Sequence, residues 1–135
     1  MKILVDTCIW SLVLRRKQPD ERFRNELGKL VLGHRIAMIG PIRQEILTGI
    51  PSKSQFQALQ SHLRAFEDVV LSSRHFEMAA ELSNNCMGKG FQGSHTDFII
   101  CAVAKSEKMA IYTNDQDFAR YSKIIGLSLH KASAT

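Results

Sequence analysis

Two aspartates follow short apolar runs of the sequence, at points where a strand is expected to end. Asp6 comes directly after the run 3–5, and Asp115 follows the run 109–112 within the stretch YTNDQDF. In a parallel sheet the carboxyl ends of the strands share one edge, and ligands bind there. We therefore expect Asp6 and Asp115 at the same edge. Asp117, two residues further on, is expected to cap or brace the next turn.

Two further acids are expected on helix faces that turn toward the core. Asp97 begins the otherwise uncharged run 97–104, and the residues that share its face at 100, 101 and 104 are Ile, Cys and Ala. Glu45 lies in the stretch PIRQEILTGI, where Ile42 and Gly49 share its face. Strand ends and helix starts in this architecture can bring all four acids to one edge of the sheet. The pattern therefore predicts that the four acidic side chains lie close together.

Each acid also has a simpler interpretation. Aspartate is a preferred helix N-cap and complements the helix dipole, which would account for Asp6, Asp97 and Asp115 one at a time. A solvated helix position would account for Glu45. Independent caps have no reason to share one place in the fold, so convergence of the side chains would favour a common site.

Clustered carboxylates favour a bound cation. Each pair repels by about 4 kcal/mol at 4 Å and an effective dielectric near 20. A set of oxygen ligands suits Mg²⁺ or Mn²⁺ rather than zinc. The chain has 18 Lys and Arg against 13 Asp and Glu, for a net charge of +5. If an ion neutralised four of the acids, 18 basic residues would face the nine that remain, which suits a phosphodiester substrate.

Other residues that could contact a phosphodiester have ordinary alternatives. The five histidines show no pairing that would support RNA cleavage through the 2′-hydroxyl. Arg15, Arg16 and Lys17 could bind backbone phosphate or complement the dipole at the end of the first helix. The glycine-rich loop around Lys89 could hold a phosphate or simply connect two helices.

The elements that must position these residues alternate between strand and helix. Apolar runs predict strands at 3–5, 36–39, 68–71 and 109–112. Helical periodicity predicts helices after Asp6, after Gly40 and in the ranges 20–32, 54–66, 74–87 and 97–104. This alternation predicts an α/β fold with three α/β/α layers around a central, mostly parallel sheet of four to five strands.

Length and composition fit one cytoplasmic domain without disulfides. A chain of 135 residues can bury roughly 65 to 70% of its unfolded surface, so we expect a single domain over residues 1–135 with the last five disordered. Cys8, Cys86 and Cys101 form no CxxC pair, which indicates reduced core residues. Asp6 interrupts the apolar N-terminus, and no stretch approaches the roughly 20 apolar residues that cross a membrane.

Four stretches, taken in order, resemble the PIN-domain nucleases and, within them, the VapC-type ribonuclease toxins of bacterial toxin-antitoxin modules. They are ILVDTCIW, PIRQEILTGI, HTDFIICAVA and IYTNDQDF, and the resemblance extends over essentially the whole chain. The resemblance implies a quartet of metal-binding catalytic acids, namely Asp6, Glu45, Asp97 and Asp115. It makes Asp117 a supplementary or alternative member, and Thr7 and Thr113 match hydroxyl positions that support the site.

The resemblance further implies an endoribonuclease that depends on Mg²⁺ or Mn²⁺ and acts as a toxin. One or two ions would activate a water for in-line attack on phosphorus, which leaves 5′-phosphate and 3′-hydroxyl ends. The implied substrate is structured RNA with single-stranded loops. The implied partners are a cognate antitoxin, whose C-terminal segment occupies grooves near the first helices, and a second copy of the chain in a homodimer.

Three other functions stay open at this point. A PIN-domain nuclease could process RNA outside a toxin module. A Mg²⁺-binding receiver domain of signalling systems needs an acidic pair after the first strand, where Asp6 stands alone. A catalytically inactive interaction module could use the same fold, although all four acids are present.

Overall fold

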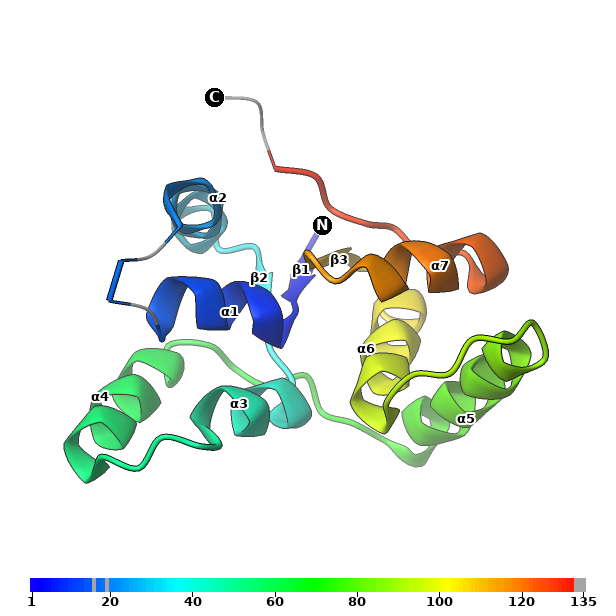
Figure 1. Ribbon diagram of the computed structural model, residues 1–135, viewed down its shortest axis with the longest axis horizontal. Coiled ribbons are helices and arrows are strands. Elements are labelled where there is room, and N and C mark those ends of the chain that lie inside the picture. The colour runs from blue at the N-terminus through cyan, green and yellow to red at the C-terminus, as the bar shows by residue number, and fades with distance from the viewer. Residues whose placement is uncertain (16, 19, 133–135) are drawn as a thin grey trace.

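Short apolar runs form the strands of the sheet in the computed structural model, which describes residues 1–15, 17–18 and 20–132. The strands are β1 (Ile3–Val5), β2 (Ile36–Ala37) and β3 (Ala110–Tyr112), and every residue in them is buried. Their order is β2-β1-β3, and both pairings are parallel. Val5 is in register with Tyr112, so the chain leaves β1 and β3 at the same edge of the sheet (Figure 1).

The sheet has three strands in the described part of the chain, and the expectation of four to five strands is wrong. In the expected strand at 68–71, Asp68 makes one isolated parallel bridge to Met38. Val70 is 84% exposed, and Ser72 already serves as the N-cap of the next helix. A strand gains stability when its side chains are covered by other elements. This segment pairs with the sheet at one residue only and then leaves it, so it does not form a strand. Leu129 makes a similar single bridge to Ile111 at the opposite edge.

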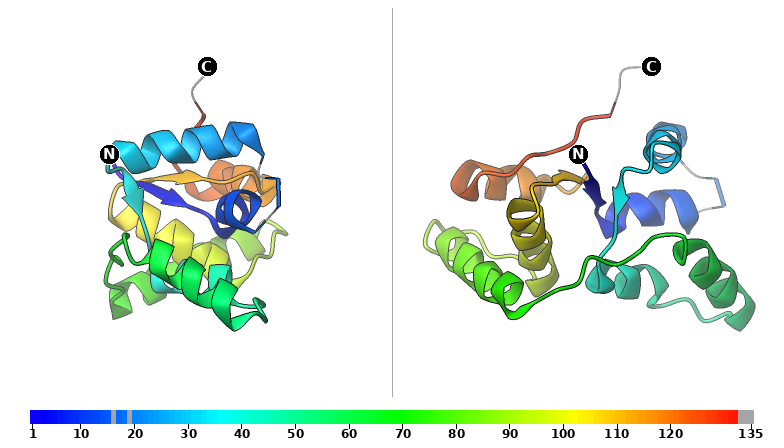
Figure 2. Two further views of the ribbon diagram at one scale, coloured as in Figure 1. Left: turned by 90° about the vertical axis from the view of Figure 1, so that its left-hand side faces the viewer. Right: turned by 180° about the vertical axis from the view of Figure 1, so that it is seen from behind.

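Helices lie on both faces of the sheet, as the predicted three-layer α/β/α arrangement requires. Figure 2 (left) shows α2 on one side of the strands and α6 on the other. The helices of the described residues are α1 (Thr7–Leu14), α2 (Glu21–Leu32), α3 (Gly40–Leu47), α4 (Lys53–Leu63), α5 (Ser73–Met87), α6 (His95–Ser106) and α7 (Gln116–Ile125). The predicted α/β fold with a parallel sheet is therefore confirmed, with fewer strands.

The central helix is α6, which the uncharged run 97–104 predicts. Its buried side chains are Phe98, Ile100, Cys101, Ala102, Val103 and Ala104. The helix begins at His95, two residues before the predicted start, because the Ser94 side chain caps it by accepting a hydrogen bond from the Asp97 backbone N–H at 3.0 Å. Asp97 therefore lies in the first turn of α6 rather than at its opening.

Several expectations about the rest of the chain can be compared with the structure. None of the helices in the described ranges is long and apolar enough to span a membrane. The three cysteines are free, and Cys86 and Cys101 are buried as predicted. Cys8 is only half-buried, so its assignment to the core is wrong. Residues 133–135 of the tail that we expected to be disordered, and Arg16, lie outside the described residues.

Candidate active site

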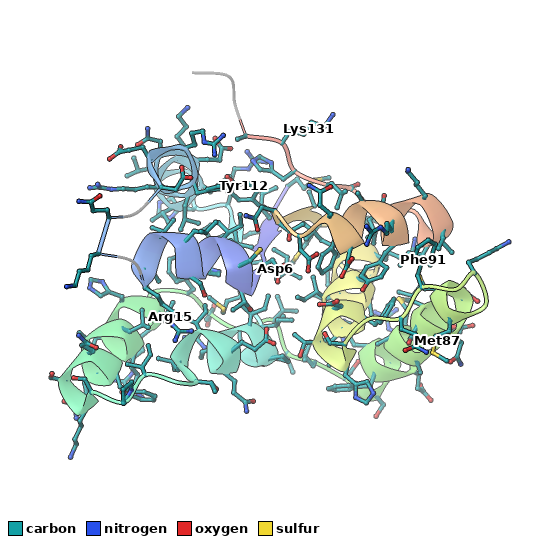
Figure 3. The ribbon with its side chains drawn as sticks, in the orientation of Figure 1. Asp6, Arg15, Met87, Phe91, Tyr112 and Lys131 are labelled. Atoms are coloured by element: carbon teal, nitrogen blue, oxygen red, sulfur yellow. The ribbon has the colours of Figure 1, made fainter. Side chains whose placement is uncertain are left out.

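Asp6 occupies the turn between β1 and α1 and is the most buried of the predicted acids, with 7% of its surface exposed. Its Oδ1 accepts a hydrogen bond from the Thr7 backbone N–H at 2.8 Å, which caps α1. Its Oδ2 accepts hydrogen bonds from Thr113 Oγ1 at 2.8 Å and from Cys8 Sγ at 3.4 Å. Figure 3 shows Asp6 near the middle of the molecule, between α1 and α6. Donors from two strand ends thus fix the orientation of this carboxylate.

Asp115 lies at the same edge, at the start of α7. Its Oδ1 accepts a hydrogen bond from the Asp117 backbone N–H at 2.9 Å, which caps α7. The Asp115 backbone N–H donates to Thr113 Oγ1 at 3.0 Å. The Thr113 hydroxyl therefore contacts both Asp6 and the backbone of Asp115. The two acids cap helices and also share one edge of the sheet. Helix capping and membership of a common site are therefore compatible explanations of their positions.

Asp97 faces this edge from α6. Ser94 caps that helix, so the N-cap interpretation of the Asp97 side chain is wrong, although a charge in the first turn still complements the helix dipole. Tyr121 Oη donates a hydrogen bond to Asp97 Oδ2 at 3.1 Å. Burial raises the pKa of Asp97, and the charges of Asp6 and Asp115 raise it further, against the opposing effect of its hydrogen bonds. The three carboxylates therefore act on one another electrostatically.

Glu45 is joined to the other acids through Thr7. The Thr7 hydroxyl donates to Glu45 Oε1 at 2.7 Å, and Thr7 directly follows Asp6. Glu45 is exposed on α3, so the expectation that it lies on a face turned toward the core is wrong. It lines a pocket of about 540 Å³ together with Thr7, Pro41, Gln44, Thr48 and Thr96. Because Thr96 precedes Asp97 in α6, this pocket lies between the Glu45 side of the site and the Asp97 side.

The donor set is suited to a hard divalent cation. It consists of carboxylate and hydroxyl oxygens, which Mg²⁺ and Mn²⁺ prefer. Burial is the main cause of the raised pKa of Asp97, and the negative charges of Asp6 and Asp115, which a cation would neutralise, add to it. Within the described residues, no three side chains of His, Cys, Asp or Glu are grouped closely enough to hold an ion together. The residues therefore fit Mg²⁺ held by one or two carboxylates and by water, which is the usual way proteins bind this ion.

Asp117 has a partner of its own. Its Oδ1 accepts a hydrogen bond from Arg120 Nη1 at 2.7 Å, one turn further along α7. The resemblance to the PIN-domain nucleases implies cleavage of RNA, and for that activity we expect Asp115→Asn to cause a loss of at least about 100-fold, as the loss of a central charged group does in other active sites. Asp117→Asn is expected to change it only a few-fold. Both rates are measured on one labelled RNA, and a reversed order would exchange the roles of the two acids.

Two residues at the site were missed by sequence reasoning. Cys8 donates to Asp6, and burial together with the charge of Asp6 raises the pKa of the thiol to about 11, so it stays protonated at neutral pH. Tyr121 contacts Asp97 through its hydroxyl although its ring is buried. Periodicity marks Tyr121 only as a core residue of α7. The placement of Cys8 two residues after Asp6 is the one signal that could have pointed to it.

Two of the basic residues that could contact phosphate, Arg15 and Lys89, are exposed in the structure. Arg15 is exposed at the end of α1 (Figure 3) and lines a groove with Cys8, Ser11, Leu12 and Asn114. The groove therefore runs from the acidic edge along one face of α1. Lys89 is exposed in the turn that follows α5.

The parallel α/β fold agrees with a comparison against known families. The profile of the PIN domain matches residues 3–124. The chain therefore belongs to the PIN domain family.

Solved structures share this fold over almost the whole chain. VapBC2 from Rickettsia felis, bound to a DNA fragment from their promoter, matches at a TM-score of 0.79 and 24% identity, over 96% of this chain and 98% of that one. FitAB bound to an IR36 DNA fragment matches at 0.79 and 21%, over 98% and 99%. FitAcB from Neisseria gonorrhoeae matches at 0.76 and 17%, also over 98% and 99%. No curated protein sequence matches the chain.

Proposed function

We propose that the protein is an endoribonuclease, dependent on Mg²⁺ or Mn²⁺, that acts as the toxin of a toxin-antitoxin module and consists of a single PIN-like domain over residues 1–135. The observation that carries this proposal is the arrangement of acids at one edge of the sheet. The Thr113 hydroxyl contacts both the Asp6 carboxylate and the backbone of Asp115, and the charges of these two acids add to the effect of burial on the pKa of Asp97. Acids gathered in this way are typical of a site that functions with a cation. Membership of the PIN family, whose domains are generally nucleases, supports the same conclusion.

The proposed roles follow from the contacts of each acid. We propose Asp6, Asp97, Asp115 and Glu45 as the acids of the metal site, with one or two of them in direct contact with the ion and the others reaching it through water. A bound ion would supply Lewis-acid catalysis and lower the pKa of water. The Thr113 hydroxyl keeps Asp6 Oδ2 in place, and the Thr7 hydroxyl does the same for Glu45 Oε1. The second oxygen of Glu45, Oε2, is then the atom to accept a proton from the attacking water.

The reaction is tested by incubating the purified protein with structured RNA in Mg²⁺, in Mn²⁺ and in EDTA. We expect cleavage only with the metal ions, and we expect each product to carry a 5′-phosphate or a 3′-hydroxyl. Ligation-dependent sequencing of the ends identifies both groups. Products ending in a 2′,3′-cyclic phosphate, or cleavage that persists in EDTA, would exclude the proposed chemistry.

The proposed partners are a cognate antitoxin and a second copy of the chain in a homodimer, in the cytoplasm. The similarity to VapBC2 and FitAB, which are toxin-antitoxin complexes, supports the antitoxin partner. A groove between the end of α1 and α4 supports an antitoxin contact near the first helices. It is lined by Val13, Leu14, Arg15, Lys17, Gly49, Ile50, Pro51, Gln55, Ala58, Leu59 and His62. Growth arrest on induction, relieved by coexpression of the protein encoded next to it, distinguishes a toxin from an RNA-processing nuclease.

A further inference from the structure

Tyr121 joins the helix that begins at Asp115 to the helix that carries Asp97. Its side chain is 1% exposed, and its hydroxyl donates to Asp97 Oδ2 at 3.1 Å. The ring packs against Phe98 and Phe118, with ring centroids 4.9 and 5.5 Å away. Because these aromatic neighbours fix the ring, the position of the hydroxyl is fixed as well. A side chain this deeply buried does not reach a substrate.

Gly93, in the loop before α6, leaves the space that this hydroxyl occupies. A Cβ atom at residue 93 would lie 2.1 Å from Tyr121 Oη, 2.8 Å from Tyr121 Cζ and 2.9 Å from Phe98 Cε2. Gly93 has no positive φ, whereas Gly90 in the same loop has a φ of 87°. Glycine is therefore required at position 93 by the approach of the tyrosine, and at position 90 by the backbone.

The environment of Asp97 explains why its orientation needs such support. Asp97 shares the edge of the sheet with Asp6 and Asp115, whose negative charges repel it. A carboxylate that can rotate relieves this repulsion by turning away from its neighbours. The bond from Tyr121 holds one oxygen of Asp97 in place from behind. Hydrogen bonds of this kind fix metal-binding side chains, and their removal typically costs 10- to 100-fold in metal affinity or activity.

We propose that Tyr121 is a positioning residue of the nuclease site: its hydroxyl fixes the Asp97 carboxylate, and Gly93 keeps open the space that the hydroxyl needs. This inference rests on the proposed function. It also gives a role to the glycine-rich loop 88–95, which seats a tyrosine of α7 and is not required to bind phosphate itself.

The test compares Tyr121→Phe and Gly93→Ala with the wild-type protein. Tyr121→Phe removes one oxygen and keeps the ring, so the fold should be retained, as thermal melts will show. We expect both variants to need about 10-fold or more Mg²⁺ for half-maximal cleavage, with activity partly restored at high Mg²⁺. The matched control is Gly88→Ala in the same loop, where a Cβ would meet its nearest atoms at 3.5 and 3.6 Å. Its Mg²⁺ dependence should equal that of the wild type.

The double variant separates positioning from general damage. If Gly93→Ala acts by displacing the Tyr121 hydroxyl, adding it to Tyr121→Phe should not raise the Mg²⁺ requirement further, because the bond is already gone. The melting temperature of the double variant should still fall, because the added Cβ would lie 2.8 Å from Cζ of the ring at position 121 and 2.9 Å from Phe98 Cε2. Fully additive increases in the Mg²⁺ requirement would overturn the role of Gly93. A wild-type Mg²⁺ dependence in Tyr121→Phe would overturn the inference and leave the proposed function intact. If Mg²⁺ raises the melting temperature of the wild-type protein but the protein cleaves no RNA, the proposed function is contradicted instead. The inference about Tyr121 is then decided by whether Mg²⁺ raises the melting temperature of the two variants less than that of the wild type.

Discussion

The Asp6→Asn variant is expected to lose Mg²⁺-dependent RNA cleavage, by at least about 100-fold, and to keep its fold. Asp6 is the most buried acid of the site, and both of its oxygens accept hydrogen bonds. Asparagine has the same shape but lacks the charge and one of the two acceptor oxygens. Its remaining oxygen can still accept from the Thr7 backbone N–H, and asparagine is as good an N-cap as aspartate. The substitution therefore removes a proposed metal ligand and preserves the start of α1.

The matched control for this variant is Asp20→Asn. Asp20 caps α2 by accepting a hydrogen bond from the Arg22 backbone N–H at 3.0 Å, so it has the capping role of Asp6 on a different helix, away from the start of α1 and α7. Initial rates on one labelled RNA should be unchanged in this control. Wild-type rates in purified Asp6→Asn would show that Asp6 is not catalytic. If Asp6→Asn is folded but inactive while Asp20→Asn stays active, the activity is lost because charge is removed at the site and not because a helix cap is changed.

The sequence was sufficient to predict the edge of the sheet at which the acids gather. Apolar runs of three or four residues, each followed by a polar turn and a helical pattern, define parallel strands, and the topology then places their ends together. Asp6 and Asp115 are at that edge for this reason. The same rule overestimated the sheet, because an apolar run such as 68–71 does not reveal whether another element will cover it. Val70 is mostly exposed, and Val69 and Leu71 are only partly buried against the core.

The hydrogen bonds that organise the site could not be predicted from hydrophobic periodicity or strand order. Thr113 reaches Asp6 across 107 positions of the chain, Thr7 reaches Glu45 across 38, and Tyr121 reaches Asp97 across 24. Periodicity assigns a residue to a face of a helix, but it does not identify the side chain that will meet it from another helix. A buried tyrosine in α7 resembles any other core aromatic until its hydroxyl is placed beside a carboxylate.

Asp97→Asn is expected to be more stable than the wild-type protein at neutral pH in EDTA, although it should be inactive. Burial, followed by the charges of Asp6 and Asp115, raises the pKa of Asp97 above its ordinary value of 3.8. The folded protein then binds a proton more tightly than the unfolded chain does. Stability therefore falls as the pH rises from about 3.8 through the raised pKa, and the full penalty is present above it. Asparagine carries no charge at any pH, and its oxygen can still accept from Tyr121.

The difference in stability between Asp97→Asn and the wild type should depend on pH and on Mg²⁺. A general effect of mutation would not show this dependence. In thermal melts with EDTA, the gain of Asp97→Asn should be full above the raised pKa and should shrink toward pH 3.8, where the carboxyl of the folded protein is protonated. Added Mg²⁺ should stabilise the wild type more than the variant, because only the wild type keeps the ligand.

Asp20 supplies the control of opposite sign. The hydrogen bond from Arg22 holds the pKa of Asp20 below its ordinary value, so its charged form favours folding above pH 3.8. Asp20→Asn should therefore give no gain in melting temperature at neutral pH, under the conditions in which Asp97→Asn gains. A melting temperature of Asp97→Asn equal to or below that of the wild type in EDTA would show that the acids do not repel one another as a cluster. A gain in both variants would point to a general effect of lowering the negative charge rather than to the site.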